Sequence, residues 1–297
     1  MTPQARAYLM ALAAVFAWST VATAFKLSLE HLRPLALVAW SALASTAVLL
    51  GVLALQGRLA RLREWPRREV LRSALFGLLN PALYYIVLFE AYDRLPAQQA
   101  QPLNYGWPVV LVLLSALFLR QPIPPRALAA MALSLLGVAV ISTRGDLLGL
   151  QFSDPVGVGL ALGSTVIWAG YWLLNLRDQR DPVARLALNF AWGTLFAFAV
   201  ALAAGELAWP TSAGLLGALY VGTFEMGLTF VLWLGALRLS RTTAQVSGLV
   251  FLSPFVSLLW IATLLGEPIH PSTPVGLLLI VAGIVALQRV MRHREPG

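Results

Sequence analysis

Long apolar runs recur from one end of the chain to the other, and short polar connectors separate them. A helix needs about 20 apolar residues to cross the hydrocarbon core of a bilayer. The runs are continuous and do not alternate with a period of two, so they predict an all-α integral membrane protein and not a membrane barrel. We expect ten transmembrane helices, at residues 7–25, 35–55, 73–92, 98–119, 127–143, 156–175, 186–204, 212–237, 243–265 and 274–290.

The connectors are too short to hold a soluble domain. The longest, at 57–70, reads GRLARLREWPRREV, and we therefore expect a single membrane domain over 1–297. The first run also resembles a signal peptide, because Arg6 precedes it and Ala22-Thr23-Ala24 looks like a cleavage site. Cleavage would leave nine spans and break the internal repeat, so we expect the first run to be retained.

The chain contains an internal repeat. Pro108 and Pro254 are 146 residues apart, and Trp18 matches Trp168 at an offset of 150. Further pairs share the offset of 146: Gln99 with Gln245, Pro122 with Pro268, Ile123 with Ile269, and Gly137 with Gly283. Several matches at one spacing favour a true repeat over chance matching among Leu- and Ala-rich helices.

Each repeat holds five spans, the first within 7–143 and the second within 156–290. An odd number of spans means that the second copy enters the membrane in the opposite orientation. Inverted repeats are typical of alternating-access transporters, whose sites lie near the midplane between the halves. The pattern therefore predicts two inverted five-helix repeats around a central cavity.

The composition agrees with exposure to lipid. Of the 297 residues, 59% are hydrophobic and 11% are charged, and the mean hydropathy is +0.77. A soluble domain is roughly half apolar and a quarter charged. The sequence has no cysteine, which excludes disulfides, thiolate metal sites and cysteine nucleophiles.

The charge gives the topology. The chain has 21 Lys and Arg against 13 Asp and Glu, a net charge of +8, which in a soluble protein would suggest a nucleic-acid partner. The ten spans place 17 of the 21 basic residues on one side and leave four on the other: Lys26, Arg33, Arg94 and Arg144. Cytoplasmic loops carry the basic excess. We therefore expect both termini in the cytoplasm and no nucleic-acid partner.

Two stretches carry a family resemblance: FAWSTVATAFK at 16–26 and GEPIHPSTPVGLLLIVAGIVAL at 266–287. They resemble the EamA family of the drug/metabolite transporter superfamily, and the whole chain is most similar to its bacterial aromatic amino acid exporters. The acidic position of the motif is kept once, since 120–123 reads RQPI where 266–269 reads GEPI. The resemblance implies ten helices, with spans 1, 3, 4, 6, 8 and 9 around the cavity, and export of amino acids or metabolites.

Polar side chains within the spans are candidates for substrate binding, because polar groups in lipid are costly and tend to face a cavity. In span 4, Gln101, Asn104 and Pro108 share one helix face, and Gln98 and Tyr105 lie on a neighbouring stripe. Amide groups could bind the zwitterion of an amino acid without burying a protein charge. The alternative is that they join helices to one another. The other polar candidates are Asn80 in span 3 and, in span 9, Gln245, Ser247 and Ser253.

Aromatic residues within the cavity helices would favour an aromatic or large apolar substrate side chain by stacking. For each of them, packing in the core is the alternative. The candidates are Trp18, Tyr84, Tyr85, Tyr105, Trp107, Trp168, Tyr171 and Trp172.

Two further features suggest moving parts. Pro108 and Pro254 interrupt spans 4 and 9 at matching positions, so we expect kinks there that act as hinges or shape the cavity statically. Asn80-Pro81 could do the same in span 3.

Glu225 lies in the middle of span 8 and aligns with Asn80 at an offset of 145. A carboxyl group there is a candidate for proton coupling, or a hydrogen-bonded structural glutamate.

The inverted repeat predicts a secondary carrier that works by alternating access, as a uniporter or linked to protons. Export, and aromatic and other neutral amino acids as substrates, are what the resemblance implies, and the polar and aromatic residues are compatible with both. The alternatives are an exporter of another small metabolite or drug, an intramembrane enzyme, or a channel. The three histidines, His31, His270 and His293, lie in loops or the tail, and the spans lack catalytic and nucleotide-binding motifs. We expect no cofactor or metal, a monomer, and a location in a bacterial inner membrane.

Overall fold

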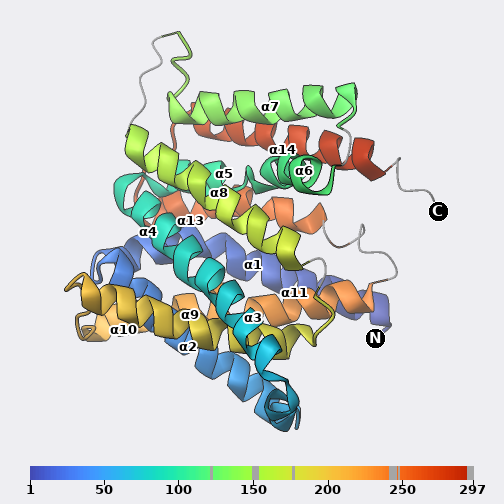
Figure 1. Cartoon of the computed structure of the whole chain (residues 1–297). Helices are drawn as coiled ribbons and strands as arrows, with labels where there is room; N and C mark the ends of the chain where they lie inside the picture. Colours follow the sequence, from blue (N-terminus) through green and yellow to red (C-terminus); the bar gives the residue numbers. More distant parts are fainter. Residues whose placement is uncertain (121–122, 149–153, 176–177, 241–245, 247, 293–297) are drawn as a thin grey trace. The chain divides into compact units, whose positions relative to one another are not determined.

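The computed structural model describes the chain except residues 121–122, 149–153, 176–177, 241–245, 247 and 293–297 (Figure 1). Within these described residues the secondary structure is helical, without strands. In the part of the chain that the structure describes, nine helices are long and apolar enough to cross a membrane, and Gly248–Leu264 is a shorter apolar helix within the run expected at 243–265. The expectation of an all-α membrane fold is confirmed.

Six of the spans are single helices. They are α1 (Pro3–Leu29), α2 (Pro34–Leu55), α7 (Pro125–Ser142), α8 (Pro155–Asn175), α9 (Pro182–Ala203) and α14 (Ser272–Arg292). Proline begins five of them, because its missing N–H costs nothing in a first helical turn. Left-handed Gly57 and Gly205 follow α2 and α9, where only glycine adopts that conformation freely.

The other four spans are interrupted. Span 3 comprises α3 (Arg67–Gly77), a π-helical turn η2 (Leu78–Leu83) and α4 (Tyr84–Arg94). Span 4 comprises α5 (Ala97–Asn104) and α6 (Trp107–Leu119). Span 8 comprises α10 (Ser212–Tyr220), the π-helical turn η3 (Val221–Glu225) and α11 (Leu228–Leu239). The described part of span 9 comprises the 3-10 helix η4 (Gly248–Leu252) and α13 (Ser253–Leu264).

The chain folds into two compact units, and each combines segments from both halves of the sequence. The first unit contains Met1–Phe89 and Gln179–Leu265, and the second contains Glu90–Asp178 and Gly266–Gly297. Each unit is described on its own.

In the first unit, α2 packs along α9, and α1 packs against α11 and α13. The hydroxyl oxygens of Thr46 on α2 and Thr194 on α9 lie 3.0 Å apart. Each hydroxyl is also 2.8 Å from the carbonyl oxygen four residues earlier in its own helix, at Ala42 and Phe190 respectively. The two sides of this contact are therefore equivalent, at an offset of 148 residues.

Two glycines of the first unit fit against neighbouring helix backbones. A Cβ atom on Gly77 would collide with the Asn189 carbonyl oxygen and lie 2.8 Å from the Gly193 nitrogen, both on α9. A Cβ atom on Gly222 would collide with the Ser41 carbonyl oxygen and lie 3.0 Å from the Ser45 nitrogen, both on α2. Ser41 and Ser45 of α2 precede Asn189 and Gly193 of α9 by 148 residues. The two glycines therefore make equivalent close contacts in the two repeats.

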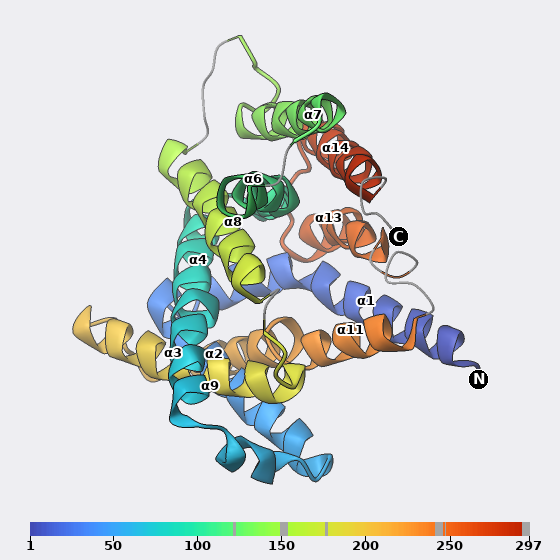
Figure 2. The same cartoon turned by 45° about the vertical axis from the view of Figure 1, so that its right-hand side comes forward.

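The second unit contains the same kind of contact between α7 and α14, which lie side by side in Figures 1 and 2. A Cβ atom on Gly137 would lie 2.5 Å from the Gly276 carbonyl oxygen. Gly283 fits in turn against the Ala130 carbonyl and Ser134, and the Ser134 hydroxyl donates to the Ile280 carbonyl at 3.1 Å. The two contacts are equivalent in the repeat. An offset of 146 residues relates Gly137 to Gly283, and the same offset relates Ala130 to Gly276 and Ser134 to Ile280.

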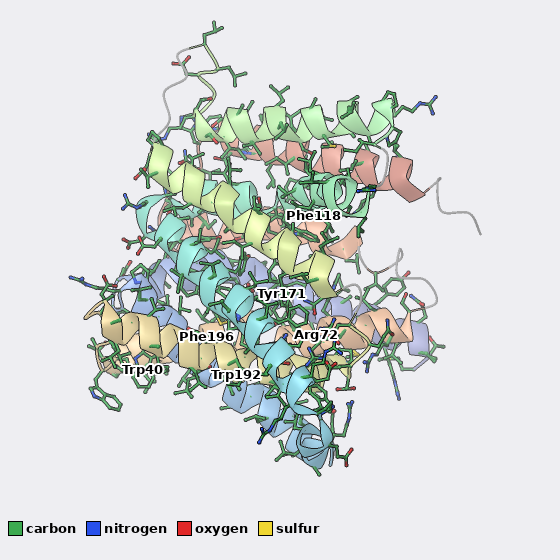
Figure 3. The ribbon with its side chains drawn as sticks, in the orientation of Figure 1. Trp40, Arg72, Phe118, Tyr171, Trp192 and Phe196 are labelled. Atoms are coloured by element: carbon green, nitrogen blue, oxygen red, sulfur yellow. The ribbon has the colours of Figure 1, made fainter. Side chains whose placement is uncertain are left out.

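Helices α2 and α9 of the first unit carry large aromatic side chains, and Figure 3 labels Trp40, Trp192 and Phe196 among them. The Trp192 and Phe196 rings stack at 6.1 Å. The indole N–H of Trp40 donates to the Ala208 carbonyl at 3.1 Å and so fixes the loop after α9. Amphipathic rings near the ends of spans are typical of membrane interfaces.

Candidate functional site

The break in span 8 places a carboxylate in the middle of the span. The π-helical turn η3 ends at Glu225, and Gly227 has the non-helical angles φ −115° and ψ −94°. Wide turns of this kind interrupt the regular backbone hydrogen bonding and occur frequently at functional sites.

Span 3 has a break at the equivalent point. Its π-helical turn begins directly after Gly77 and contains Asn80, whose angles of φ −144° and ψ 117° are not helical. The offset of 145 residues that relates Gly77 to Gly222 also relates Asn80 to Glu225. Both halves of the chain therefore interrupt the equivalent span at an equivalent, tightly packed glycine, and each places a polar side chain three residues after that glycine.

A tyrosine joins the two breaks. The Tyr85 hydroxyl donates a hydrogen bond of 3.1 Å to Oε1 of Glu225, and the Tyr85 side chain is fully buried. Its ring contacts Tyr84 at a centroid distance of 4.7 Å and Phe89 at 5.5 Å. The structure thus brings three predicted site residues together: Tyr84, Tyr85 and Glu225.

Asn80 is fully buried, and neither its amide nitrogen nor its amide oxygen has a hydrogen-bond partner among the described residues. An unpaired buried amide costs free energy, roughly 1–3 kcal/mol by mutational measures. Its neighbour Pro81 packs closely on Gly193 of α9, which holds the turn in place. Asn80 therefore remains the most conspicuous candidate for ligand binding in the first unit.

Trp18 lies elsewhere in the first unit. It packs against α11, with ring centroids 5.9 Å from Phe230 and 5.3 Å from Trp233. These contacts agree with core packing, the alternative that the sequence left open. Gln245, the predicted counterpart of Gln99 in span 9, and Ser247 lie outside the described residues.

The matching prolines occupy matching places, although not inside continuous helices. Pro108 is buried in the first turn of α6, and Pro254 is buried in the first turn of α13. Because a first-turn proline gives up no helical hydrogen bond, each proline starts the second segment of a broken span. The hinge role of both residues stays a prediction.

In the second unit, span 4 supplies the polar residues. Asn104 Nδ2 donates to the Ser164 hydroxyl on α8 at 2.8 Å, so this amide joins two helices. Gln101 is buried, and its amide oxygen has no partner among the described residues. Tyr105 and Trp107 flank the break between α5 and α6 and are partly buried.

The aromatic candidates of span 6 form one group on α8. Trp168 stacks on Tyr171 at a centroid distance of 5.9 Å and meets Trp172 edge-on at 6.0 Å. The indole nitrogen of Trp172 is buried without a hydrogen-bond partner in the described part of the chain. Figure 3 labels Tyr171 on this helix.

Gln98 has a different environment from the one that the sequence suggested. Its amide nitrogen donates to the Pro268 carbonyl at 2.8 Å, and its amide oxygen accepts from His270 N at 2.8 Å and from Thr273 Oγ1 at 3.0 Å. The Glu267 carboxylate caps the same helix end by accepting from Ala97 N at 3.0 Å. The partners of Gln98 lie about 170 residues away in sequence, so no local pattern could have identified them.

We expect Gln98→Ala to lower the stability and to leave substrate affinity unchanged. Three hydrogen bonds of this amide, each contributing about 0.5–1.5 kcal/mol, hold the loop before α14. Thermal unfolding in detergent and the substrate concentration for half-maximal flux should be measured together. Gln101→Ala is the matched control on the same helix, for which we expect the affinity to change. A weaker affinity in Gln98→Ala with an unchanged Tm would contradict this structural role.

Sequence comparisons agree with this architecture. The profile of the EamA-like transporter family matches residues 5–143 and again residues 155–288. The chain is 28% identical to "Aromatic amino acid exporter YddG" of Ancylobacter novellus over 233 residues, which cover 76% of this chain and 78% of that protein. It is 30% identical to "Probable terminal-alkyne amino-acid exporter" of Streptantibioticus cattleyicolor over 234 residues, 77% of each chain.

An uncharacterized transporter of Bacillus subtilis, YvbV, is 29% identical over 230 residues, 75% of this chain and 72% of that protein. One solved crystal structure shares the fold, with a TM-score of 0.68 at 22% identity, and the alignment covers 98% of this chain and 99% of that one. The chain belongs to the EamA-like transporter family, and it is a multi-pass membrane transporter rather than an enzyme.

Proposed function

We propose that this protein is a secondary carrier that exports aromatic and other neutral amino acids from the cytoplasm by alternating access. The observation that carries the proposal is the pair of matched breaks at Asn80 and Glu225. Discontinuous helices at corresponding positions of two repeats build the midplane sites of many carriers, because the interrupted backbone frees polar groups for a ligand.

The close contacts within each unit support two inverted repeats, 7–143 and 156–290. Gly77 and Gly222 pack against equivalent positions of α9 and α2, and Gly137 of α7 and Gly283 of α14 each pack on the other helix of that pair. The family profile also matches the chain twice, over nearly the same two ranges.

The substrate class rests on relatives and on side-chain chemistry. Two relatives carry names of amino-acid exporters. In the first unit the candidate ligands of the substrate are Asn80, Tyr84 and Tyr85. Amide and hydroxyl groups suit a zwitterion, and aromatic rings suit an aromatic side chain. In the second unit the candidates are Gln101, Asn104, Tyr105, Trp107, Trp168 and Trp172.

The orientation follows from the basic residues. With both termini in the cytoplasm, 17 of the 21 Lys and Arg residues face the cytoplasm, as the positive-inside rule requires. Bacterial relatives indicate an inner membrane. Export is then movement from the arginine-rich side to the side of Lys26 and Arg33.

Flux in proteoliposomes tests the proposal. We expect saturable, counterflow-competent transport of labelled Phe and Trp, with Thr and Met as smaller neutral substrates and protein-free liposomes as the control. Absence of flux for every amino acid would refute the substrate class. A parallel series with an imposed pH gradient decides the energetics: acceleration supports proton linkage through Glu225, and indifference to the gradient leaves a uniporter.

A further inference from the structure

We propose that Glu225, held by Tyr85, binds the ammonium group of the transported amino acid. This inference rests on the proposed function and names the residue that recognises the positive end of its substrate. It is carried by the environment of Glu225 within the first unit.

Glu225 lacks a basic partner in the part of the chain that the structure describes. Its carboxylate accepts the Tyr85 hydroxyl at 3.1 Å, and none of the ion pairs formed by the described residues includes it. A carboxylate within a membrane span is costly unless a positive group or a proton accompanies it. One neutral hydroxyl satisfies a single acceptor site of a group that has about four. The remaining acceptor sites suit a donor that carries charge.

The equivalent position in the other half is uncharged. Asn80 lies in the matching turn of span 3, is fully buried, and has no hydrogen-bond partner among the described residues. If both turns had only a structural role, an amide would serve in both places. Glu225 is the single acidic side chain of this pair of turns, which suits a ligand with one positive group.

The chemistry favours an ammonium group over a metal ion. Calcium and magnesium ions need six or more oxygen ligands, and zinc takes four ligands that are mostly His and Cys, whereas Glu225 and Tyr85 supply one carboxylate and one hydroxyl. An ammonium group carries three N–H donors, and its charge-assisted bond to a carboxylate is roughly twice as strong as a neutral hydrogen bond. The rings of Tyr84 and Phe89 adjoin Tyr85, and the ring of Phe25 packs on Phe89. This aromatic group suits a neighbouring aromatic side chain of the substrate.

Competition with substrate analogues tests this assignment. Labelled phenylalanine flux should be measured against phenethylamine, which keeps the ammonium group and lacks the carboxylate, and against 3-phenylpropionate, which does the reverse. In the unaltered protein we expect phenethylamine to compete at least 10-fold better than 3-phenylpropionate. In Glu225→Gln we expect the KM for phenylalanine to rise about 10- to 100-fold and phenethylamine to lose its advantage.

Three variants complete the design. Glu225→Asp keeps the charge and should retain the preference for phenethylamine, and Tyr85→Phe should weaken phenylalanine binding several-fold without reversing that preference. Glu90→Gln is the control, since Glu90 is a second glutamate of the spans and lies near the end of α4, and it should leave the preference unchanged.

Equal competition by the two analogues in the unaltered protein would overturn the assignment, even if Glu225→Gln failed to fold. An unchanged KM for phenylalanine in a folded Glu225→Gln protein would also overturn it. Failure of the proposed function looks different, because the unaltered protein would then move no amino acid at all.

Discussion

Alanine at Gly77 or at Gly222 is expected to destabilise the protein by about 3 kcal/mol or more, near the upper end of overpacking effects. The added methyl group would meet a backbone carbonyl in each case, Asn189 on α9 or Ser41 on α2. A flexible side chain could turn away, but a helix backbone must move as a whole. Thermal unfolding of each variant in detergent measures the loss, and we expect a lower yield of monodisperse protein.

The two substitutions should also reduce transport in whatever fraction folds. Gly77 directly precedes the turn η2 and Gly222 lies within the turn η3, so a displaced helix would carry Asn80 or Glu225 with it. Gly163→Ala on α8 is the matched control, since its Cβ atom would meet nothing within 4 Å. Alanine there should be neutral or slightly stabilising. A Tm for Gly77→Ala or Gly222→Ala equal to that of this control would refute the close contact.

Arg180→Ala is expected to cost about 2–3 kcal/mol, because it breaks a mostly buried network at the start of span 3. Arg180 Nη1 donates to the Glu69 carbonyl at 2.8 Å and to the Ser73 hydroxyl at 2.7 Å. Its Nε lies 3.3 Å from the Glu69 carboxylate, and the guanidinium stacks 5.0 Å over the Trp65 ring. The Arg180 side chain is 9% exposed and that of Glu69 is 28% exposed, so solvent screening moderates the loss.

Lysine at position 180 distinguishes charge from geometry. It keeps the positive charge but cannot reproduce the planar fork or the stacking on Trp65, so we expect it to recover less than half of the lost stability. Arg68→Ala is the control on α3, the helix that Arg180 contacts, because Arg68 is exposed and its loss should change stability by about 0.5 kcal/mol or less. A Tm of Arg180→Lys equal to that of the unaltered protein would show that charge alone matters.

The spans could be predicted from the sequence, and prolines marked breaks in spans 3, 4 and 9, whereas the π-helical form of the breaks in spans 3 and 8 could not be predicted. Length and hydropathy determine where a chain crosses the bilayer, and among the described residues nine of the ten expected runs appear as helices long enough to do so. A π-helical turn depends on how close a neighbouring backbone approaches. The offset of 145 between Gly77 and Gly222 was the available signal, and its meaning becomes clear only when α9 and α2 are seen beside them.

For the candidate site too, the sequence predicted some features, and others depended on the tertiary fold. Intramembrane polar and aromatic residues were found by residue type, and Tyr84, Tyr85 and Glu225 do come together. Residue type could not reveal that Gln98 forms hydrogen bonds with the loop before α14. The partners of Gln98 in that loop, Pro268 and His270, are brought close only by the tertiary fold. Proline chemistry likewise indicated a discontinuity at Pro108, but whether proline bends a helix or begins one depends on the residues before it.

The Thr46–Thr194 contact has an evolutionary consequence. A contact in which a residue meets its own counterpart is isologous, the kind that forms between two identical subunits across a twofold axis. A five-helix ancestor able to insert in both orientations could have formed this contact, and those of Gly77 and Gly137, between two copies. In such a dimer the positions of Asn80 and Glu225 would have to be the same residue. Once the two copies are joined in one polypeptide, the residues at these two positions can differ. The carrier then has one acidic residue in its pair of turns instead of two.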